Sequence, residues 1–359
     1  MAAIHQFTAG FAWHDAISNE ANHFRNIFRK WGYSSEIFCD PANTSRDRRG
    51  EIKDIHAAAT EISPNDLVLL HLSIGSVANT VFESLPCKKA ILYHNVTPAH
   101  YFQFTNPQTA AHLQRGRQQV AALAGKATIN LADSAFNAQE MESMGYANVQ
   151  VLPIVIDTEL MSIPPTPRLM DKLKDGMLNV IFVGRCSPNK KIEDVLRVFA
   201  WLQKNITPLS RLTLVGSKAG NERYHAMLLA MCKEWQLANV TFTGSVSQDD
   251  LHAYYKSAHA FLCMSEHEGF CIPLIESMMY DVPIVAMADA AVPETLDRAG
   301  IQLTERAYDV AAEAIYRLHQ DRDLCNAVLL AQRERLARYK SRNLEAELQE
   351  ALAHALPSQ

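Results

Sequence analysis

Short apolar segments alternate with amphipathic stretches along almost the whole chain. Six apolar segments in the first half predict buried β-strands, at residues 3–7, 35–39, 67–71, 90–94, 127–131 and 149–152. The stretches between them have the apolar period of helices. Residues 15–30, for example, place Ile17, Phe24 and Phe28 on one side, and Gly32 follows as a stop signal. This alternation predicts a parallel sheet with helices on both faces.

A proline-rich, polar stretch at residues 152–174 interrupts the alternation, and we expect a linker there. Beyond it, five apolar segments predict strands at residues 178–183, 211–215, 240–242, 260–264 and 283–286, and residues 305–356 have a helical pattern only. We expect an N-terminal Rossmann-like domain at 1–155, a linker at 156–177, a second Rossmann-like domain at 178–340 and a final helix at 341–359. That last helix could pack back on the N-terminal domain.

Composition and charge narrow the class of protein. The 359 residues are 48% hydrophobic and 20% charged, which is typical of a folded globular protein. The net charge of −5 argues against a general nucleic-acid binder, and no apolar run approaches the length of a membrane-spanning helix. The first residues lack a secretory signal, so we expect a cytoplasmic protein. Seven widely spaced cysteines without a C-x-x-C motif indicate reduced thiols and no metal site.

Ligands of doubly wound sheets bind beyond the carboxyl ends of the strands, so residues that directly follow the strands are candidates. The run V-G-R-C-S-P-N-K-K at 183–191 follows a predicted strand, and Gly184 permits a close backbone approach there. Arg185 and Lys190 could hold a diphosphate between two fixed cations. A solvated basic loop is the alternative interpretation.

A second run, S-E-H-E-G-F-C-I-P-L-I-E at 265–276, leads from a predicted strand into a helix that starts near Ile272. The unpaired N–H groups of a helix start, beside Gly269, form an anion site. Glu268 precedes the helix and Glu276 lies within it, where carboxylates can accept hydrogen bonds from sugar hydroxyls. Helix capping with a solvated face is the alternative, although Phe270 makes this loop apolar.

These runs resemble the retaining glycosyltransferase family 4, which has the two-domain GT-B fold. Glu268 and Glu276 match its E-x7-E pattern, and F-T-G-S-V-S at 242–247 and A-V-P-E-T-L at 291–296 add further matches in the expected order. The resemblance implies that Arg185 and Lys190 bind the donor diphosphate, or Lys191 in place of Lys190 if the register of the loop differs by one residue. It also implies that Glu276 holds the donor ribose and that Glu268 faces the donor sugar. Further donor contacts are implied for Gly10, Gly216, Val246, Gly269, Phe270, Cys271 and Ile272.

The first half resembles a bacterial branch of the same family at L-L-H-L-S-I-G-S (69–76) and L-Y-H-N-V-T-P (92–98). The position of His94 matches a histidine that contacts the transferred sugar, whereas a structural role suits His71 better. Together with His94, the resemblance implies catalytic roles for Arg185, Lys190 and Glu268. The acceptor-side candidates are Trp13, His14, Asp15, Tyr93 and Asn95.

The resemblance implies a metal-independent hexosyltransferase without a cofactor, which uses a UDP- or GDP-sugar as donor. The acceptor is expected to be a saccharide or a lipid-linked saccharide in cell-surface polysaccharide or glycolipid synthesis. Two basic clusters, Arg25, Arg29 and Lys30 and then Arg46, Arg48 and Arg49, either meet an anionic membrane surface peripherally or are ordinary solvated surface. A sugar phosphorylase, a nucleotide-sugar epimerase and a non-catalytic nucleotide-sugar binding subunit are the alternatives.

Overall fold

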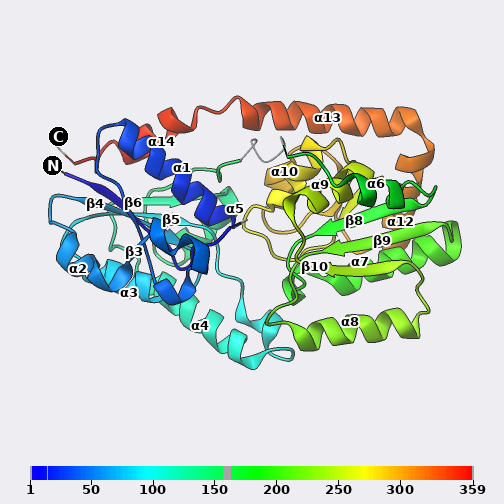
Figure 1. Ribbon diagram of the computed structural model, residues 1–359, viewed down its shortest axis with the longest axis horizontal. Coiled ribbons are helices and arrows are strands. Elements are labelled where there is room, and N and C mark those ends of the chain that lie inside the picture. Colours follow the sequence, from blue (N-terminus) through cyan, green and yellow to red (C-terminus); the bar gives the residue numbers. More distant parts are fainter. Residues whose placement is uncertain (1, 14, 157–162, 358–359) are drawn as a thin grey trace. The chain divides into compact units, whose positions relative to one another are not determined.

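The computed structural model describes residues 2–13, 15–156 and 163–357. The chain forms two compact units (Figure 1). The first unit comprises Met1–His100, Gln108–Val155 and Asn343–Gln359, and the second comprises Tyr101–Pro107 and Ile156–Arg342. Each unit contains one parallel β-sheet between layers of helices.

The sheet of the first unit has the strand order β3-β2-β1-β4-β5-β6-β7. Its strands are β1 (Ile4–Phe7), β2 (Ile37–Cys39), β3 (Lys53–Asp54), β4 (Leu67–Leu72), β5 (Lys88–Tyr93), β6 (Ile129–Ala132) and β7 (Val149–Val151). Its helices are α1 (Ala16–Lys30), α2 (Ala58–Glu61), α3 (Val77–Ser84), α4 (Pro107–Ala122), α5 (Ala135–Ser143) and α14 (Leu344–Leu352). The chain reverses its direction of winding between β1 and β4, and such a point is where doubly wound sheets open a crevice.

Helix α1 shows how local chemistry sets these elements. The carboxylate of Asp15 accepts the backbone N–H of Ser18 and caps the helix start. Gly32 follows the helix with a φ of +90°, a conformation that glycine adopts without strain. Phe24 and Phe28 are fully buried in the core beneath α1, and Leu348 of α14 joins the same core. The final helix therefore packs within the first unit.

The sheet of the second unit has the strand order β10-β9-β8-β11-β12-β13, with all neighbours parallel. Its strands are β8 (Leu178–Val183), β9 (Ser210–Val215), β10 (Val240–Gly244), β11 (Ala260–Cys263), β12 (Ile284–Met287) and β13 (Ile301–Leu303). Its helices are α6 (Pro167–Leu173), α7 (Ile192–Trp201), α8 (Glu222–Glu234), α9 (Gln248–Ser257), α10 (Ile272–Met279), α11 (Val292–Leu296), α12 (Tyr308–Gln320) and α13 (Arg322–Lys340). The change of winding lies between β8 and β11.

Three features differ from the sequence prediction. The stretch predicted as a linker contains helix α6, which starts at Pro167 because proline suits the first turn of a helix. The residues of α6 belong to the second unit. Strands β3 and β13, which are two and three residues long, were not predicted. Strand β5 ends at Tyr93, so His94 is the first residue beyond it.

The predicted basic clusters contain exposed side chains, such as those of Arg46 and Arg49, and arginines that bond within the first unit. Arg48 is only 1% exposed, bonds Glu51 and lies 4.1 Å from the ring of Phe11. The guanidinium of Arg25 bonds the carbonyl of Glu51 at 2.8 Å, and Arg29 bonds that of Ser35. These arginines fasten loops of the first unit, so the solvated-patch interpretation is wrong for Arg48.

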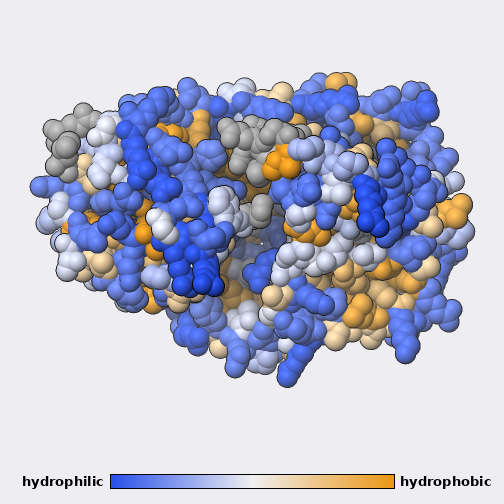
Figure 2. Space-filling model, in the orientation of Figure 1, coloured by the Kyte–Doolittle hydropathy of each residue, from blue (hydrophilic) through white to orange (hydrophobic). Residues whose placement is uncertain are grey.

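Figure 2 shows a mostly hydrophilic face, on which hydrophobic residues appear in small groups between hydrophilic ones. None of the helices among the described residues is both long and apolar enough to cross a membrane.

Candidate functional site

Two loops meet in the crevice of the second sheet, one after β8 and one after β11. Asn189 joins them: its side-chain amide donates to the carbonyl of His267 at 3.1 Å, and its carbonyl accepts the N–H of Glu266 at 3.0 Å. Lys190 and Glu268, predicted from the two separate motifs, form an ion pair across this junction. The crevice therefore brings both motifs into one site.

The Lys190–Glu268 pair is largely buried, with side chains 22% and 7% exposed. Burial alone would lower the pKa of Lys190, but the facing carboxylate outweighs it and raises that pKa, so the ammonium stays charged. Lys191 instead pairs with Glu193 at 3.5 Å and Glu266 at 3.3 Å. The fixed cation of the crevice is thus Lys190, and Lys191 faces other groups.

Arg185 also belongs to the loop after β8. Its side chain is exposed, and within the described part of the chain its guanidinium has no hydrogen-bond or ion-pair partner. A guanidinium without protein partners can take up an anion.

Helix α10 begins beside Glu268. Cys271 precedes it with a φ of +70°, and no side chain among the described residues caps the helix start. Uncapped N–H groups at a helix start favour an anion. Phe270 is held in place because its carbonyl accepts the hydroxyl of Thr295 at 2.5 Å and its ring packs on Tyr339.

Glu276 lies within α10, where its carboxylate accepts the hydroxyl of Tyr255 at 2.7 Å. Burial raises the pKa of Glu276, and this hydrogen bond opposes the rise. Tyr255 is itself fixed by stacking on Tyr280, with ring centroids 5.1 Å apart. The carboxylate of Glu276 is therefore held in position by Tyr255 and Tyr280 without a bound ligand.

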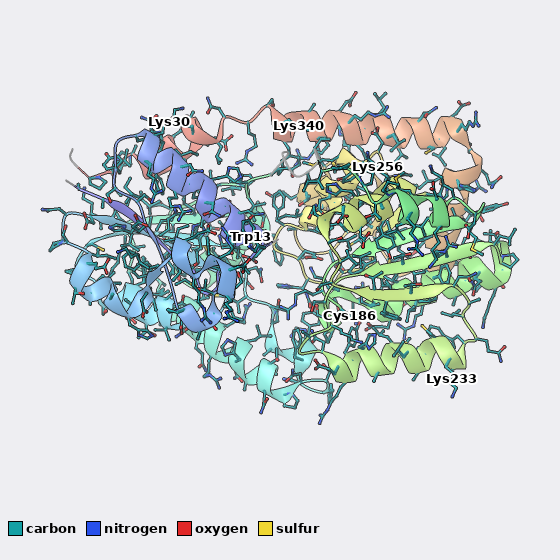
Figure 3. All side chains as sticks on the ribbon, viewed as in Figure 1. Trp13, Lys30, Cys186, Lys233, Lys256 and Lys340 are labelled. Atoms are coloured by element: carbon teal, nitrogen blue, oxygen red, sulfur yellow. The ribbon has the colours of Figure 1, made fainter. Side chains whose placement is uncertain are left out.

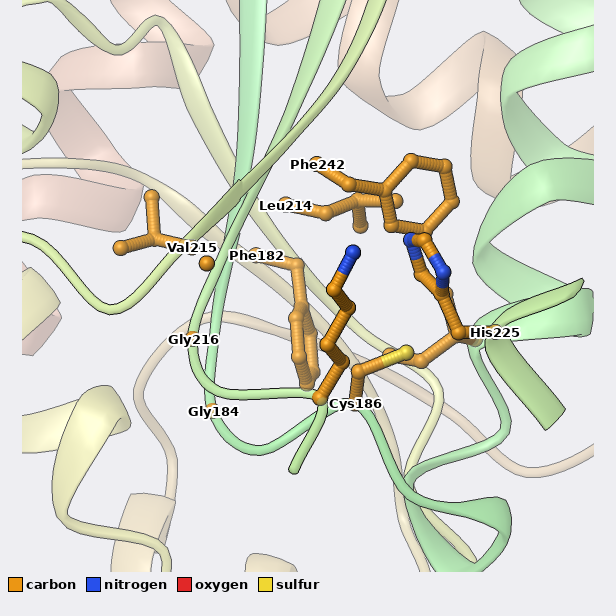
Figure 4. A pocket seen from close by; sticks show the side chains of 11 residues that line it. Phe182, Gly184, Cys186, Leu214, Val215, Gly216, His225 and Phe242 are labelled. Atoms are coloured by element: carbon orange, nitrogen blue, oxygen red, sulfur yellow. The ribbon is translucent and has the colours of Figure 1, made fainter. Parts of the chain in front are cut away.

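A pocket opens at the carboxyl ends of β8, β9 and β10 (Figure 4). The rings of Phe182 and Phe242 line it, together with His225 and the backbone of Gly184 and Gly216. Val246 lies half-buried in the loop that follows β10. Gly216 is required sterically, because a Cβ there would lie 1.9 Å from the carbonyl oxygen of Gly184.

Cys263, Glu268 and Cys271 bring one ligand atom each within 4.8 Å of one another, a set that could hold a metal ion. The ammonium of Lys190 already occupies Glu268, and a second cation beside it would be repelled. The thiols themselves are buried. The absence of a metal requirement stays a prediction.

In the first unit, a cavity of about 430 Å³ lies beside the loops after β1 and β4, where the winding changes. Gly10 and Asp15 line it, with Ser73, Ser76 and His112. Sequence reasoning missed the last three.

Trp13 lies next to the residues of this cavity and is labelled in Figure 3. Trp13 is 55% exposed, yet its ring lies 4.2 Å from the guanidinium of Arg48 and donates its Nε1–H to Asp47. His14 lies outside the described residues.

The three predicted residues at the end of β5 have mostly buried side chains. Tyr93 donates its hydroxyl to Glu140 at 2.6 Å and has no exposed surface, so it supports the loop rather than lining a site. Asn95 has a φ of +81° and donates to Asn137 at 2.6 Å. The side chain of His94 is 2% exposed, and its ring nitrogens face buried groups.

Two of these buried groups, Glu20 and Asp133, were missed by sequence reasoning. Glu20 carries a signal that could have found it: it occupies the apolar side of α1, four residues before Phe24, where a solvated carboxylate is not expected. Asp133 follows β6 and Asn189 lies in the loop after β8. Neither residue stands in a sequence pattern that indicates its role.

The chain was compared with known proteins. Residues 171–340 match the family described as "Glycosyl transferases group 1". Over 162 residues the chain is 26% identical to O-antigen chain mannosyltransferase B of Escherichia coli, a match covering 42% of this chain and 40% of the relative. Over 201 residues it is 27% identical to a GDP-mannose-dependent alpha-(1-6)-phosphatidylinositol monomannoside mannosyltransferase of Mycobacterium tuberculosis, covering 52% and 51%. The matches thus span about half or less of these curated relatives.

Solved structures match over nearly the full length. Sucrose-phosphate synthase of Thermosynechococcus elongatus superimposes with a TM-score of 0.75 at 16% identity, covering 99% of both chains. Anabaena HepE in complex with UDP and glucose gives a TM-score of 0.73 at 16% identity, covering 99% of this chain and 100% of the other. The two Rossmann-like units therefore form the GT-B fold, as the sequence predicted.

Proposed function

We propose that the chain is a retaining glycosyltransferase of family 4. It would transfer a hexose from a UDP- or GDP-sugar to a hydroxyl of a saccharide or lipid-linked saccharide, in the synthesis of a cell-surface polysaccharide or glycolipid. One observation carries the proposal: the Lys190 ammonium lies at the change of winding, in the same crevice as Glu268 and the uncapped start of α10. An ammonium and free helix N–H groups beside a carboxylate support a site for a diphosphate next to a group that can accept hydrogen bonds from sugar hydroxyls.

The chemistry follows from these groups. In the transfer, the bond from the anomeric carbon to the phosphate oxygen breaks, and negative charge develops on the leaving diphosphate. Lys190, Arg185 and the N–H groups of α10 would stabilise that charge. Glu268, which holds Lys190 in the ligand-free protein, would then accept hydrogen bonds from the donor sugar.

Retention of configuration would result from attack by the acceptor hydroxyl on the face that the diphosphate leaves. The acceptor oxygen bonds to the anomeric carbon, and its proton passes to the leaving phosphate oxygen. No covalent sugar–enzyme intermediate is needed. A glycosyl adduct trapped on Glu268 would contradict this route, and product anomers can be assigned by NMR.

Separate observations support the proposed donor and the proposed acceptor. Glu276, fixed by Tyr255, suits the two ribose hydroxyls of a nucleotide. The names of the relatives, two of which are mannosyltransferases, favour GDP-mannose among the donors. The cavity beside Gly10, with the exposed ring of Trp13, is the proposed acceptor side.

Nucleotide binding tests this proposal by thermal shift with UDP, GDP and ADP. A nucleotide at 100 times its dissociation constant should add about 2.7 kcal/mol to the free energy of unfolding. We expect one nucleotide to stabilise the wild type and to stabilise Arg185→Ala much less, because that variant lacks the arginine available to the diphosphate. Arg317→Ala, an exposed arginine of α12 paired with Glu313, is the matched control and should keep the full shift. Equal shifts in both variants would exclude Arg185 from the site.

A further inference from the structure

Four buried ionisable side chains meet in the first unit, and the chemistry proposed above uses none of them. They are Glu20 of α1, His71 of β4, His94 after β5 and Asp133 after β6. We call them the His71–His94 cluster. Their side chains are between 0% and 3% exposed. Burying four such groups is costly unless each charge has an opposite charge and each proton an acceptor. The contacts of each ring nitrogen therefore indicate where the protons lie.

The protonation of His71 is fixed by Gln6. The side-chain N–H of Gln6 donates to the carbonyl of Ala21 at 2.9 Å, so its amide oxygen faces His71. Nε2 of His71 lies 2.9 Å from that oxygen and must therefore carry a hydrogen. Burial lowers the pKa of His71 and keeps the ring neutral, even though Glu20 opposes the shift. A neutral ring with its proton on Nε2 presents a bare Nδ1.

That nitrogen faces His94, and the carboxylate of Glu20 also lies 3.6 Å from it. Nδ1 of His71 and Nε2 of His94 are 3.1 Å apart. The two rings are within 9° of parallel, and their centroids are 5.3 Å apart. The distance between the centroids exceeds the distance between the nitrogens by nearly the width of one imidazole ring. This is possible only if both nitrogens lie near the line that joins the centroids, so the rings meet edge to edge. Two nitrogens aimed along one line share a proton, and here that proton must be on His94.

A metal ion is the competing explanation, because Glu20, His71 and His94 bring three ligand atoms together. Metal ligation needs lone pairs that converge at an angle on a point between them. The edge-to-edge approach directs the two histidine nitrogens at each other instead. The geometry thus favours a proton over a metal at this position.

The other side of His94 faces a second carboxylate. Nδ1 of His94 lies 3.4 Å from Asp133, and Nε2 lies 3.4 Å from Glu20. Asp133 is oriented by Asn137, which donates to its other oxygen at 2.6 Å. A proton on each nitrogen of His94 gives both carboxylates a charged partner.

We propose that His94 is a buried imidazolium, with Glu20 and His71 as the positioning residues that fix its protonation and its orientation for glycosyl transfer. The functional half of this statement rests on the proposed function. Burial would lower the pKa of His94, but Asp133 and Glu20, with a contribution from Asp15, raise it above its ordinary value. One carboxylate lies 3.4 Å from each ring nitrogen, and this arrangement favours the charged form of the ring.

The test is NMR titration of histidine-labelled protein without ligand, which needs no activity. We expect the His94 ring to titrate above its ordinary pKa with both nitrogens protonated, and His71 to stay neutral with the proton on Nε2. In Glu20→Gln, the pKa of His94 should fall by about one unit or more, because an opposite charge is lost at close range. Asp133→Asn should also lower it, and serves if Glu20→Gln does not fold.

Asp66→Asn is the matched control, since Asp66 is a buried carboxylate of the same unit that accepts the N–H groups of Ala3 and Ser63. It should leave the pKa of His94 unchanged. A His94 ring that is neutral throughout pH 6–8, or stoichiometric bound zinc by elemental analysis, would overturn the proposal.

Kinetics then link the cluster to transfer. With the donor found by the nucleotide panel, the alkaline limb of kcat should move to lower pH in Glu20→Gln, with little change in the KM for the donor. If no donor is turned over, the proposed function fails while the titration still decides the state of His94. An unshifted alkaline limb together with a lowered His94 pKa would remove the link to catalysis.

Discussion

Replacing Lys190 by alanine is expected to lower the rate of sugar transfer by about 10²–10³-fold, the usual effect of removing one preorganised charge donor. Lys190 is the cation that the crevice holds in a fixed position, at the change of winding and beside the start of α10. The loss should appear in kcat, because the negative charge on the diphosphate grows as the sugar–phosphate bond breaks. Steady-state kinetics with the preferred donor measure it.

Two companion variants separate chemistry from folding. Lys191→Ala removes a neighbouring lysine that pairs with Glu193 and Glu266, and should cost about fivefold or less. Lys190→Ala also leaves Glu268 buried without its partner, which destabilises the fold. The double variant Lys190→Ala with Glu268→Ala should recover stability without recovering activity. A larger loss in Lys191→Ala than in Lys190→Ala would show that Lys191 is the catalytic cation.

Replacing Gly216 by alanine is expected to destabilise the protein by roughly 3 kcal/mol or more, through backbone strain and a steric clash. The residue has a φ of +145°, and a Cβ would lie 1.9 Å from the carbonyl oxygen and 2.6 Å from the carbonyl carbon of Gly184. Neither atom belongs to a movable side chain, so the loops after β8 and β9 must separate. Chemical denaturation measures the change in the free energy of unfolding.

Gly220→Ala is the matched control for this prediction. Gly220 also has a positive φ, of +77°, but a Cβ there meets nothing within 4 Å. It should cost only about 1 kcal/mol from the left-handed backbone conformation. Equal costs in the two variants would mean that the contact between the loops does not constrain Gly216. Nucleotide binding should also weaken in Gly216→Ala, because the displaced loops line the pocket in Figure 4.

The sequence predicted the larger elements well because their signals are local. Helix α1 is predictable from the cap at Asp15, the apolar side with Phe24 and Phe28, and the stop at Gly32. Strands β4 and β11, each beside a change of winding, are fully buried and mostly apolar, and such runs can be recognised from the sequence. Strands as short as β3 leave too few residues for a period.

The crevice of the second unit was predictable because its two loops follow strands that the fold makes adjacent. Lys190 and Glu268 lie 78 residues apart, yet both follow the inner strands of one sheet. The connecting role of Asn189 could not be predicted, because it depends on the path of the opposite loop. The same holds for the His71–His94 cluster, in which Glu20, His71 and Asp133 come from three separate elements. His94 was singled out by its place in the L-Y-H-N-V-T-P run, and only the structure shows what surrounds it.

The most direct test of the central claim is to measure release of nucleoside diphosphate and transfer of the sugar from a panel of UDP- and GDP-sugars, GDP-mannose included, with saccharide acceptors. The account predicts turnover with one nucleotide class, an α-configured product from an α-configured donor, and loss of both in Lys190→Ala. Absence of nucleotide release from every donor, together with phosphate-dependent cleavage of a disaccharide, would contradict it.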